Sequence, residues 1–236
     1  MSDARPIRAV ISDFGGVLTS PLFESFAAWQ RTSGLSFERL GQAMADAAER
    51  SGIHPLYELE KGTITEAELL GMLEAELDPG TNLSEMRDVY FEHLHPNPPM
   101  IEVMRELRGR GLRMALLTNN VREWEPHWRA KLPEIDEIFE VVVDSAFVGM
   151  RKPDPDIYAL TLERLGDGLE PADCLFVDDV DVNCETAASL GMRVVHYREA
   201  AQAIEEIRAQ IGGEAPVTRG RKPSERTKGG HGSPPK

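Results

Sequence analysis

The sequence predicts an α/β protein in which a Rossmann-like parallel sheet carries an inserted α-helical domain. From about residue 94 onward, short apolar runs rich in β-branched residues alternate with segments of helical periodicity. Between the first apolar run and the second lies a long stretch, residues 20–93, whose pattern is helical throughout. Alternation of this kind gives parallel strands joined by right-handed crossovers. We therefore expect a core formed by residues 1–19 and 94–211, interrupted by a helical domain at 20–93.

The first strand is expected in the apolar run that ends at Asp13. Both faces of this run are apolar, as required of a strand that helices cover on both sides. Gly15 and Gly16 follow at once and allow the backbone to turn sharply and to approach a ligand closely. Ligands of open α/β sheets bind at this edge, although an aspartate there can also simply cap the next helix. The run alone leaves both interpretations open.

The inserted region begins at a break of Ser20 and Pro21 and is predicted to form several short helices. Phe23, Phe26 and Ala27 share one helical face. Further on, residues 65–68 match a capping box and precede a leucine-rich run, which indicates a helix start.

The rest of the core follows in regular order. Strands are predicted at residues 112–117, 141–144, 174–177 and 193–196. Helices are predicted at 100–110, around Trp124 and Trp128, at 156–165, at 187–190 and near 200–211. Each strand is thus followed by a helix, as the parallel sheet requires.

Charge is distributed unevenly along the chain. The formal net charge is −14, yet residues 212–236 carry a net +4, so the remainder carries −18. An acidic body argues against nucleic acid and anionic membranes as partners. The last segment is rich in Gly, Pro, Ser and Lys and lacks aromatic residues, so we expect a disordered basic tail over 212–236.

The composition also predicts a cytoplasmic protein. No apolar run approaches the ~20 residues that span a bilayer, and the polar first eight residues do not resemble a signal peptide. Two cysteines, Cys174 and Cys184, fit a reducing compartment better than a disulfide scaffold. The sequence carries no signal for the oligomeric state.

Polar residues follow three of the predicted strands and should meet at one edge of the sheet. They are Asp13, Thr118 and the pair Asp178–Asp179, and Lys152 lies on a loop that can lean over the same edge. Carboxylates about 4 Å apart repel by roughly 4 kcal/mol per pair at an effective dielectric of about 20. A divalent cation and the ammonium of Lys152 would compensate for that repulsion. Oxygen ligands without a nearby His or Cys favour Mg²⁺.

Taken together, these residues resemble the motifs of the haloacid dehalogenase (HAD) superfamily of hydrolases. The motifs occur in the family's order: Asp13-Phe14-Gly15-Gly16-Val17, then Thr118-Asn119-Asn120, Lys152-Pro153, and Asp178-Asp179 with Asn183. The resemblance extends from about residue 7 to 211, and the inserted region resembles the helical cap of the first cap class. The segments 149–153 and 176–179 are similar to phosphatases related to the N-terminal domain of soluble epoxide hydrolase.

The resemblance implies a nucleophile and a metal site. Asp13 would attack phosphorus and form an aspartyl-phosphate that water then hydrolyses. Mg²⁺ would be held by Asp179, by the Asp13 carboxylate and by the backbone carbonyl of Gly15. Asp178 would lie beside the metal as a ligand or water-holder. Asn183 either caps its helix or hydrogen-bonds the metal ligands, and we favour the second role.

The resemblance also implies how the phosphoryl group is bound. Thr118 would donate its hydroxyl and Asn119 its backbone N–H to phosphoryl oxygens, while Lys152 would neutralise charge on Asp13 and the phosphoryl group. The predicted function is therefore a Mg²⁺-dependent phosphomonoester hydrolase that acts on a small phosphorylated metabolite. Within the cap, Phe23, Trp29, Tyr57 and Glu60 are predicted to select the substrate.

Gly15 departs from the family pattern. The family's phosphatases commonly carry a second aspartate here, which acts as general acid toward the leaving group. Water, a cap residue or an intrinsically good leaving group would have to replace it. A 2-haloacid dehalogenase is an alternative function, although Asp178 and Asp179 would repel a halocarboxylate. A non-catalytic protein that binds a phosphorylated ligand is a further alternative, but such a protein would not need the nucleophile Asp13.

Overall fold

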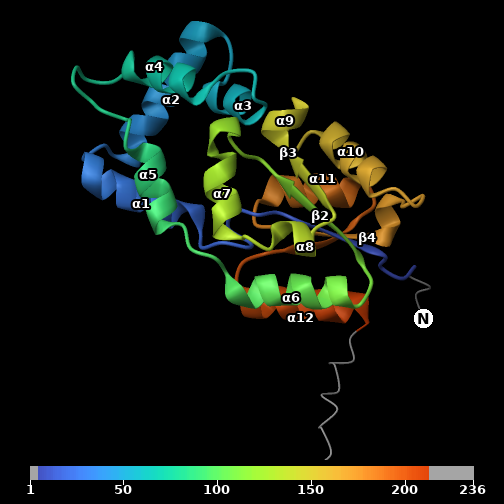
Figure 1. The fold of residues 1–236 in the computed structure, drawn as a ribbon. Coiled ribbons are helices and arrows are strands. Elements are labelled where there is room, and N and C mark those ends of the chain that lie inside the picture. The colour runs from blue at the N-terminus through green and yellow to red at the C-terminus, as the bar shows by residue number, and fades with distance from the viewer. Residues whose placement is uncertain (1–4, 213–236) are drawn as a thin grey trace, which may run out of the picture.

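A computed structural model, in which residues 5–212 are described, contains a five-stranded parallel sheet (Figure 1). Its strand order is β3-β2-β1-β4-β5. The strands are β1 (Ala9–Ser12), β2 (Arg113–Thr118), β3 (Val141–Asp144), β4 (Cys174–Asp178) and β5 (Arg193–His196). β1 is central and all four of its residues are buried, because helices cover both faces of the sheet.

Helices cover the two faces as separate layers. One face packs on α6 (Pro98–Gly109), α8 (Ile135–Ile138) and α12 (Ala200–Ile211), and the other on α10 (Pro155–Leu165) and α11 (Asp181–Ser189). Alternate residues of β1 divide between the two cores: Val10 belongs to the first and Ile11 to the second. Figure 1 shows α6 and α12 side by side beneath the sheet. These two layers hold the sheet in place, and the polar residues that follow its strands lie at one edge of it.

Five helices inserted after β1 form a second body with its own core. They are α1 (Leu22–Ser33), α2 (Phe37–Ser51), α3 (Pro55–Glu60), α4 (Glu66–Glu74) and α5 (Met86–His93). Their shared core includes the buried side chains of Trp29, Ala43, Leu59 and Leu73. Figure 1 shows them above the edge of the sheet, together with α7 (Glu125–Lys131) and α9 (Ser145–Val148) of the core. This is the arrangement of a helical cap over a parallel sheet.

The two connections between cap and core run side by side. Thr19 forms an isolated antiparallel bridge with Pro96. The side-chain amide of Asn97 donates to the carbonyl of Val17 at 2.8 Å and contacts the hydroxyl of Tyr197 at 2.9 Å. The outgoing and returning chains therefore support each other where the cap joins the core.

The structure confirms the predicted fold class, a parallel sheet with an inserted helical cap. The strand predicted at 112–117 lies one residue later, and the helix predicted at 187–190 begins at Asp181 as α11. The short helices α8 and α9 were not predicted because four residues are too few for a helical period to show. The helix predicted around Trp124 and Trp128 begins as the 3₁₀ helix η1 (Arg122–Trp124) and continues as α7, whereas the 3₁₀ helix η2 (Pro171–Asp173) was not predicted.

Two expectations from the sequence are left open by the fold. The exact boundaries of the cap, at residues 20 and 93, stay a prediction. The expected disordered tail falls almost entirely on residues 213–236, which lie outside the described part of the chain. Within residues 5–212, every helix is too short or too polar to cross a membrane.

A loop of the cap touches the core at Gly62. Its φ is +69°, and a Cβ at this position would lie 2.2 Å from the backbone oxygen of Ala146 in α9. Gly52 has a similar φ of +73° but no atom within 4 Å of such a Cβ. The two glycines therefore share a backbone conformation and differ only in whether the core lies against them.

We predict that Gly62→Ala destabilises the fold more than Gly52→Ala. Gly52→Ala, the control, should lower the free energy of unfolding by about 1–2 kcal/mol, because alanine is strained in a left-handed backbone conformation. Gly62→Ala should cost a further ~1–3 kcal/mol, because Cβ overpacks against backbone that cannot move freely. Urea unfolding followed by circular dichroism measures both free energies. Equal losses in the two variants would mean that the cap does not rest on the core at Gly62.

Candidate active site

The turn after β1 brings Asp13 close to Asp179. The backbone N–H of Asp13 donates to the carbonyl of Val177 at 2.9 Å, which extends the β1–β4 pairing to the end of the strand. Gly16 has a φ of +78°, and a Cβ there would lie 2.3 Å from Oδ2 of Asp179. Only glycine satisfies both conditions. The turn thereby lets the Asp179 carboxylate approach the backbone beside Asp13.

Lys152 is buried between two carboxylates. Its side chain is 1% exposed, and Nζ lies 2.7 Å from Oδ1 of Asp13 and 2.7 Å from Oδ2 of Asp178. The side chain of Asn119 holds the backbone of this lysine: its Oδ1 accepts from the Lys152 N–H at 2.8 Å and its Nδ2 donates to the Lys152 carbonyl at 2.9 Å. Asn119 therefore fixes the loop from which the ammonium reaches Asp13.

Asp178 has most of its hydrogen-bonding capacity occupied. Its Oδ1 accepts from the Val180 N–H at 2.9 Å and from Nδ2 of Asn183 at 3.0 Å. Its Oδ2 accepts from Lys152, and the Asn183 amide lies 3.2 Å away from it. Asn183 is buried, so its side chain lies against Asp178 rather than in solvent. Asp178 is thus an anchor for Lys152 and for the start of α11.

The three aspartates form a cluster suited to a cation. One carboxylate oxygen each of Asp13, Asp178 and Asp179 can be chosen so that all lie within 4.8 Å of one another. Three carboxylates face the single ammonium of Lys152, which leaves two negative charges uncompensated. Hard oxygen donors in this number fit Mg²⁺, which binds through one or two carboxylates and keeps several waters. The donor set present therefore fits a magnesium ion.

The pKa values in the cluster follow from burial and charge. Burial raises the pKa of Asp13 to about 7, although the attraction of Lys152 opposes this. Burial and then the neighbouring Asp178 also raise the pKa of Asp179. Burial lowers the pKa of Lys152, but Asp13 and Asp178 outweigh it, so this pKa lies above its ordinary value and the ammonium stays charged. A bound cation would favour the ionised carboxylates.

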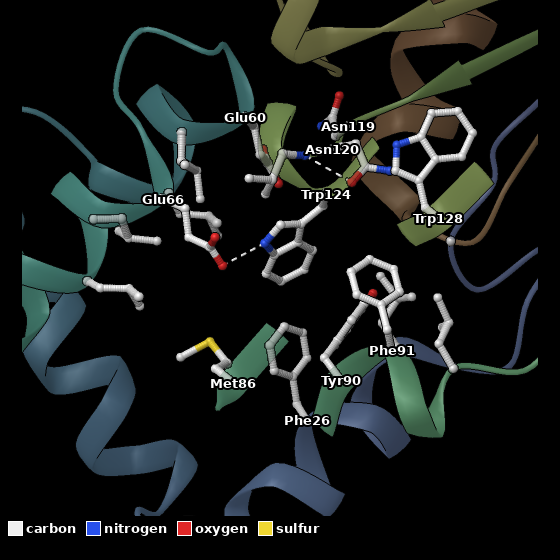
Figure 2. A pocket seen from close by; sticks show the side chains of 18 of the residues that line it. Phe26, Glu60, Glu66, Met86, Tyr90, Phe91, Asn119, Asn120, Trp124 and Trp128 are labelled. Carbon is white, nitrogen blue, oxygen red and sulfur yellow. Dashed lines mark hydrogen bonds between the residues drawn. The ribbon is translucent and has the colours of Figure 1, made fainter. Parts of the chain in front are cut away.

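Beside the cluster lies a cavity of about 430 Å³ between the sheet edge and the cap (Figure 2). Gly15, Thr118 and Asn119 line it from the core, and Thr118 is itself buried at the end of β2. Side chains of α1 to α5 line it from the cap. Figure 2 shows Trp124, Tyr90 and Phe91 around its centre. The cavity thus reaches two of the predicted phosphate-binding residues, Thr118 and Asn119, whereas Lys152 lies outside its lining.

The structure corrects the prediction of substrate-selecting residues in the cap. Only Glu60 of the four lines the cavity. Phe23 is 67% exposed, Trp29 lies inside the cap's own core, and Tyr57 packs beneath the guanidinium of Arg151, 4.1 Å from its ring centroid. The prediction was wrong for these three because sequence gives the apolar face of a helix but not the side on which that face meets the cavity.

Sequence reasoning missed two features of the site. The first is the side chain of Asn119, for which only a backbone role was predicted although it positions Lys152. The second is the aromatic lining formed by Phe26, Tyr90, Phe91 and Trp124, which comes from three separate segments. The available signal was the spacing of Trp124 and Trp128, which lie four residues apart and so share one face of a predicted helix. Both residues line the cavity.

The chain belongs to the haloacid dehalogenase-like hydrolase family, whose model matches residues 7–191. The predicted family is therefore confirmed, and with it the assignment of the protein as a hydrolase. A relative from Mycobacterium tuberculosis (strain CDC 1551 / Oshkosh) named phosphatase MT3486 is 30% identical, over 79% of this chain and 85% of its own length.

Two longer relatives match through part of their length. The pig bifunctional epoxide hydrolase 2 is 28% identical over 87% of this chain, which confirms the similarity to that protein. The mouse acyl-CoA dehydrogenase family member 10 is 32% identical over 89% of this chain. The chain spans only 39% and 20% of these two relatives, respectively.

Solved structures share the fold. A HAD family enzyme from Bacteroides thetaiotaomicron, in complex with magnesium and inorganic phosphate, superposes with a TM-score of 0.63 at 21% identity. The match covers 81% of this chain and 94% of that one. At this identity the likeness establishes the fold of the described residues and nothing finer.

We predict that Lys152→Met destabilises the protein strongly at pH 7.5 and less at pH 5. Removing one partner of a buried ion cluster costs about 3–5 kcal/mol, because the carboxylates stay buried without compensation. Protonation of Asp13, whose pKa is already raised to about 7 and rises further without the ammonium, relieves part of this cost at low pH. Urea unfolding of wild type and variant at both pH values, with chelator present, measures the difference.

Lys61→Met is the matched control. Lys61 is the partner of Glu58 on the surface of the cap, with a side chain that is 31% exposed, so its removal should cost at most about 1 kcal/mol at either pH. The proposed charge balance would be contradicted if Lys152→Met lowered the free energy of unfolding as little as Lys61→Met does. It would also be contradicted if the loss in Lys152→Met were as large at pH 5 as at pH 7.5.

Proposed function

We propose that this protein is a Mg²⁺-dependent phosphomonoester hydrolase that acts on a small phosphorylated metabolite through an aspartyl-phosphate on Asp13. The observation that carries the proposal is the buried carboxylate of Asp13, which Lys152 holds at the strand edge beside two further aspartates. Its chain neighbours Phe14 and Gly15 line the adjoining cavity. Similarity to a protein named a phosphatase supports it, as does a HAD structural neighbour that holds magnesium and phosphate.

In this reaction Asp13 is the nucleophile. A carboxylate oxygen forms a bond to phosphorus while the ester P–O bond breaks and the organic group departs with its oxygen. Water then cleaves the acyl phosphate, which releases inorganic phosphate and restores Asp13. Lys152 holds one oxygen of Asp13 at 2.7 Å, so the ammonium orients the nucleophile and offsets its charge as the phosphoryl group approaches.

Other residues bind the phosphoryl group and the metal. Thr118, through its hydroxyl, and Asn119, through its backbone N–H, donate to phosphoryl oxygens from the end of β2, and Lys152 offsets their charge. Asp13, Asp179 and the Gly15 carbonyl would hold Mg²⁺, with Asp178 beside it and Asn183 orienting Asp178. When bound, this ion neutralises charge on the transferring phosphoryl group.

The two alternatives fit the site less well. A halocarboxylate would enter a cavity whose described lining contains no Lys, Arg or His, next to three aspartates. A protein that only binds a phosphorylated ligand has no need for a carboxylate that repels it. The small-molecule substrate stays a prediction from the family resemblance. The cytoplasmic location and the absence of nucleic-acid or membrane partners stay predictions from composition.

We predict that the purified protein hydrolyses an aryl phosphate only with Mg²⁺, and that Asp13→Asn lowers kcat by about 10⁴-fold or more because the amide is not a nucleophile. The amide matches the carboxylate in shape and removes a buried charge, so the fold should persist. Asp181→Asn is the control, because Asp181 is 84% exposed at the start of α11. Phosphate release, followed with and without chelator, measures both variants.

Two outcomes would contradict the assignment. Activity that survives Asp13→Asn would rule out Asp13 as the nucleophile. Activity that is unchanged by chelator would rule out the dependence on Mg²⁺. Chloropropionate serves as the dehalogenase control: chloride release that exceeds phosphate release and needs no metal would favour the alternative function.

A further inference from the structure

The cavity beside Asp13 is lined almost entirely by apolar side chains. On the cap side they include Leu22, Phe26, Met86 and Tyr90, and on the core side Trp124. Several of these rings are in mutual contact: Phe26 and Tyr90 have centroids 4.9 Å apart, and Tyr90 and Trp124 have centroids 5.0 Å apart. Figure 2 shows these rings turned toward the same open space. A cavity of this volume and character suits an apolar organic group.

The two carboxylates in this lining are already paired. Glu60 binds Nε of Arg151 at 2.5 Å. Glu66 binds Arg87 at 2.8 Å and accepts from the indole N–H of Trp124 at 2.7 Å, as the dashed line in Figure 2 marks. Since the described lining contains no Lys, Arg or His, a second anionic group of a substrate would have no counter-charge there. A polyhydroxylated group would lose its water without gaining enough partners.

The leaving group of a substrate faces an apolar surface as well. Gly15 lines the cavity, and a Cβ at this position would lie 3.1 Å from both Cδ atoms of Leu22. The side chain of Leu22 thus occupies the space in which a larger residue at position 15 would place a polar group. Burial raises the pKa of Glu60, and the guanidinium of Arg151 opposes that rise. Glu60 and Glu66 are the acidic side chains of the described lining, and each is already held by an arginine. The described lining therefore offers no unpaired acid to protonate an alkoxide.

We propose that the substrate is the phosphate ester of an apolar phenol. This inference rests on the proposed phosphatase function and specifies its substrate class. The aromatic rings of the cavity hold the apolar ring of the substrate, and Asp13 attacks its phosphorus. The aryl O–P bond breaks with its electron pair on oxygen, so that a phenolate departs and takes its proton from solvent. A phenolate is a stable enough anion to leave without an acid from the protein.

The test measures the hydrolysis of three phosphate esters by the 236-residue chain with Mg²⁺. The esters are naphthyl phosphate, octyl phosphate and a hexose phosphate. Octyl phosphate should bind with a KM similar to that of naphthyl phosphate, since both are apolar. Its kcat should be lower by about 10²–10⁴-fold, because an alkoxide needs the proton that the site does not supply. The hexose phosphate should have a KM at least about tenfold higher than that of either, because its hydroxyls find few partners.

Two phenylalanines on one helix provide matched variants. Phe26 lines the cavity, whereas Phe23 on α1 does not and is 67% exposed. Phe26→Leu should raise the KM for naphthyl phosphate about two- to tenfold, because the variant loses one contact between aromatic rings. Phe23→Leu should leave it unchanged. Leucine is apolar and helix-compatible, so both variants should fold.

A variant at Gly15 tests the missing proton donor directly. Gly15→Asp needs only a shift of the flexible Leu22 side chain. It should raise the ratio of kcat for octyl phosphate to kcat for naphthyl phosphate at least about tenfold, because only the alkoxide needs the proton. An unchanged ratio would contradict the missing proton donor.

The inference is overturned by any of three results. These are a hexose phosphate with kcat/KM equal to that of naphthyl phosphate, equal kcat for octyl and naphthyl phosphate, or equal effects of the two phenylalanine variants. A fall in octyl phosphate turnover in Glu60→Gln, with naphthyl phosphate unaffected, would identify Glu60 as an acid and also overturn it. Hydrolysis of none of the esters would instead refute the phosphatase function itself, which separates the two failures.

Discussion

The structure of the site depends on one buried ammonium. Lys152 lies between Asp13, which directly follows β1, and Asp178 at the end of β4, so a single charge joins two neighbouring strands at their carboxyl ends. Without it, carboxylates placed this close in a largely buried region would repel each other by several kcal/mol. Asn119 directly follows β2, and its side-chain amide forms hydrogen bonds with both the backbone N–H and the backbone carbonyl of the same lysine. Three strand ends therefore converge on one residue, and the position of the Asp13 carboxylate follows from that convergence.

The cap brings a different chemistry to the same place. The sheet edge supplies charge and hydrogen-bond donors, whereas the cap helices supply mainly hydrocarbon and aromatic surface. Ion pairs such as Glu60–Arg151 join the two bodies and at the same time occupy the few charged groups that border the cavity. One half of the site is thus suited to a phosphoryl group and the other to an apolar organic group. This division explains how a strongly acidic protein can offer an environment that is attractive to a ligand with an apolar end.

The sheet and its polar strand ends were predictable because their causes are local. A strand buried on both faces must be a short apolar run, and the residue after it, such as Asp13 or Thr118, must lie at the sheet edge. The cavity was not predictable in this way. Phe26, Tyr90 and Trp124 come together only after five cap helices pack on one another and on the core, and each could equally have been an ordinary core residue. The failure at Phe23 has the same origin, because it and Phe26 are both apolar positions of α1 and only packing separates them.

Gly15 and Gly16, the two glycines after Asp13, look alike in the sequence but have different roles in the structure. In the sequence both permit a sharp turn. In the structure Gly16 alone is demanded by the backbone, since its φ of +78° and the Asp179 carboxylate at 2.3 Å from a Cβ exclude every other residue. Gly15 is opposed only by the movable side chain of Leu22. The fold therefore tolerates glycine at position 15 without requiring it. A glycine there leaves the side chain of Leu22 where a larger residue could place a proton donor. This is the geometric basis for the proposal that the leaving group needs no proton from the protein.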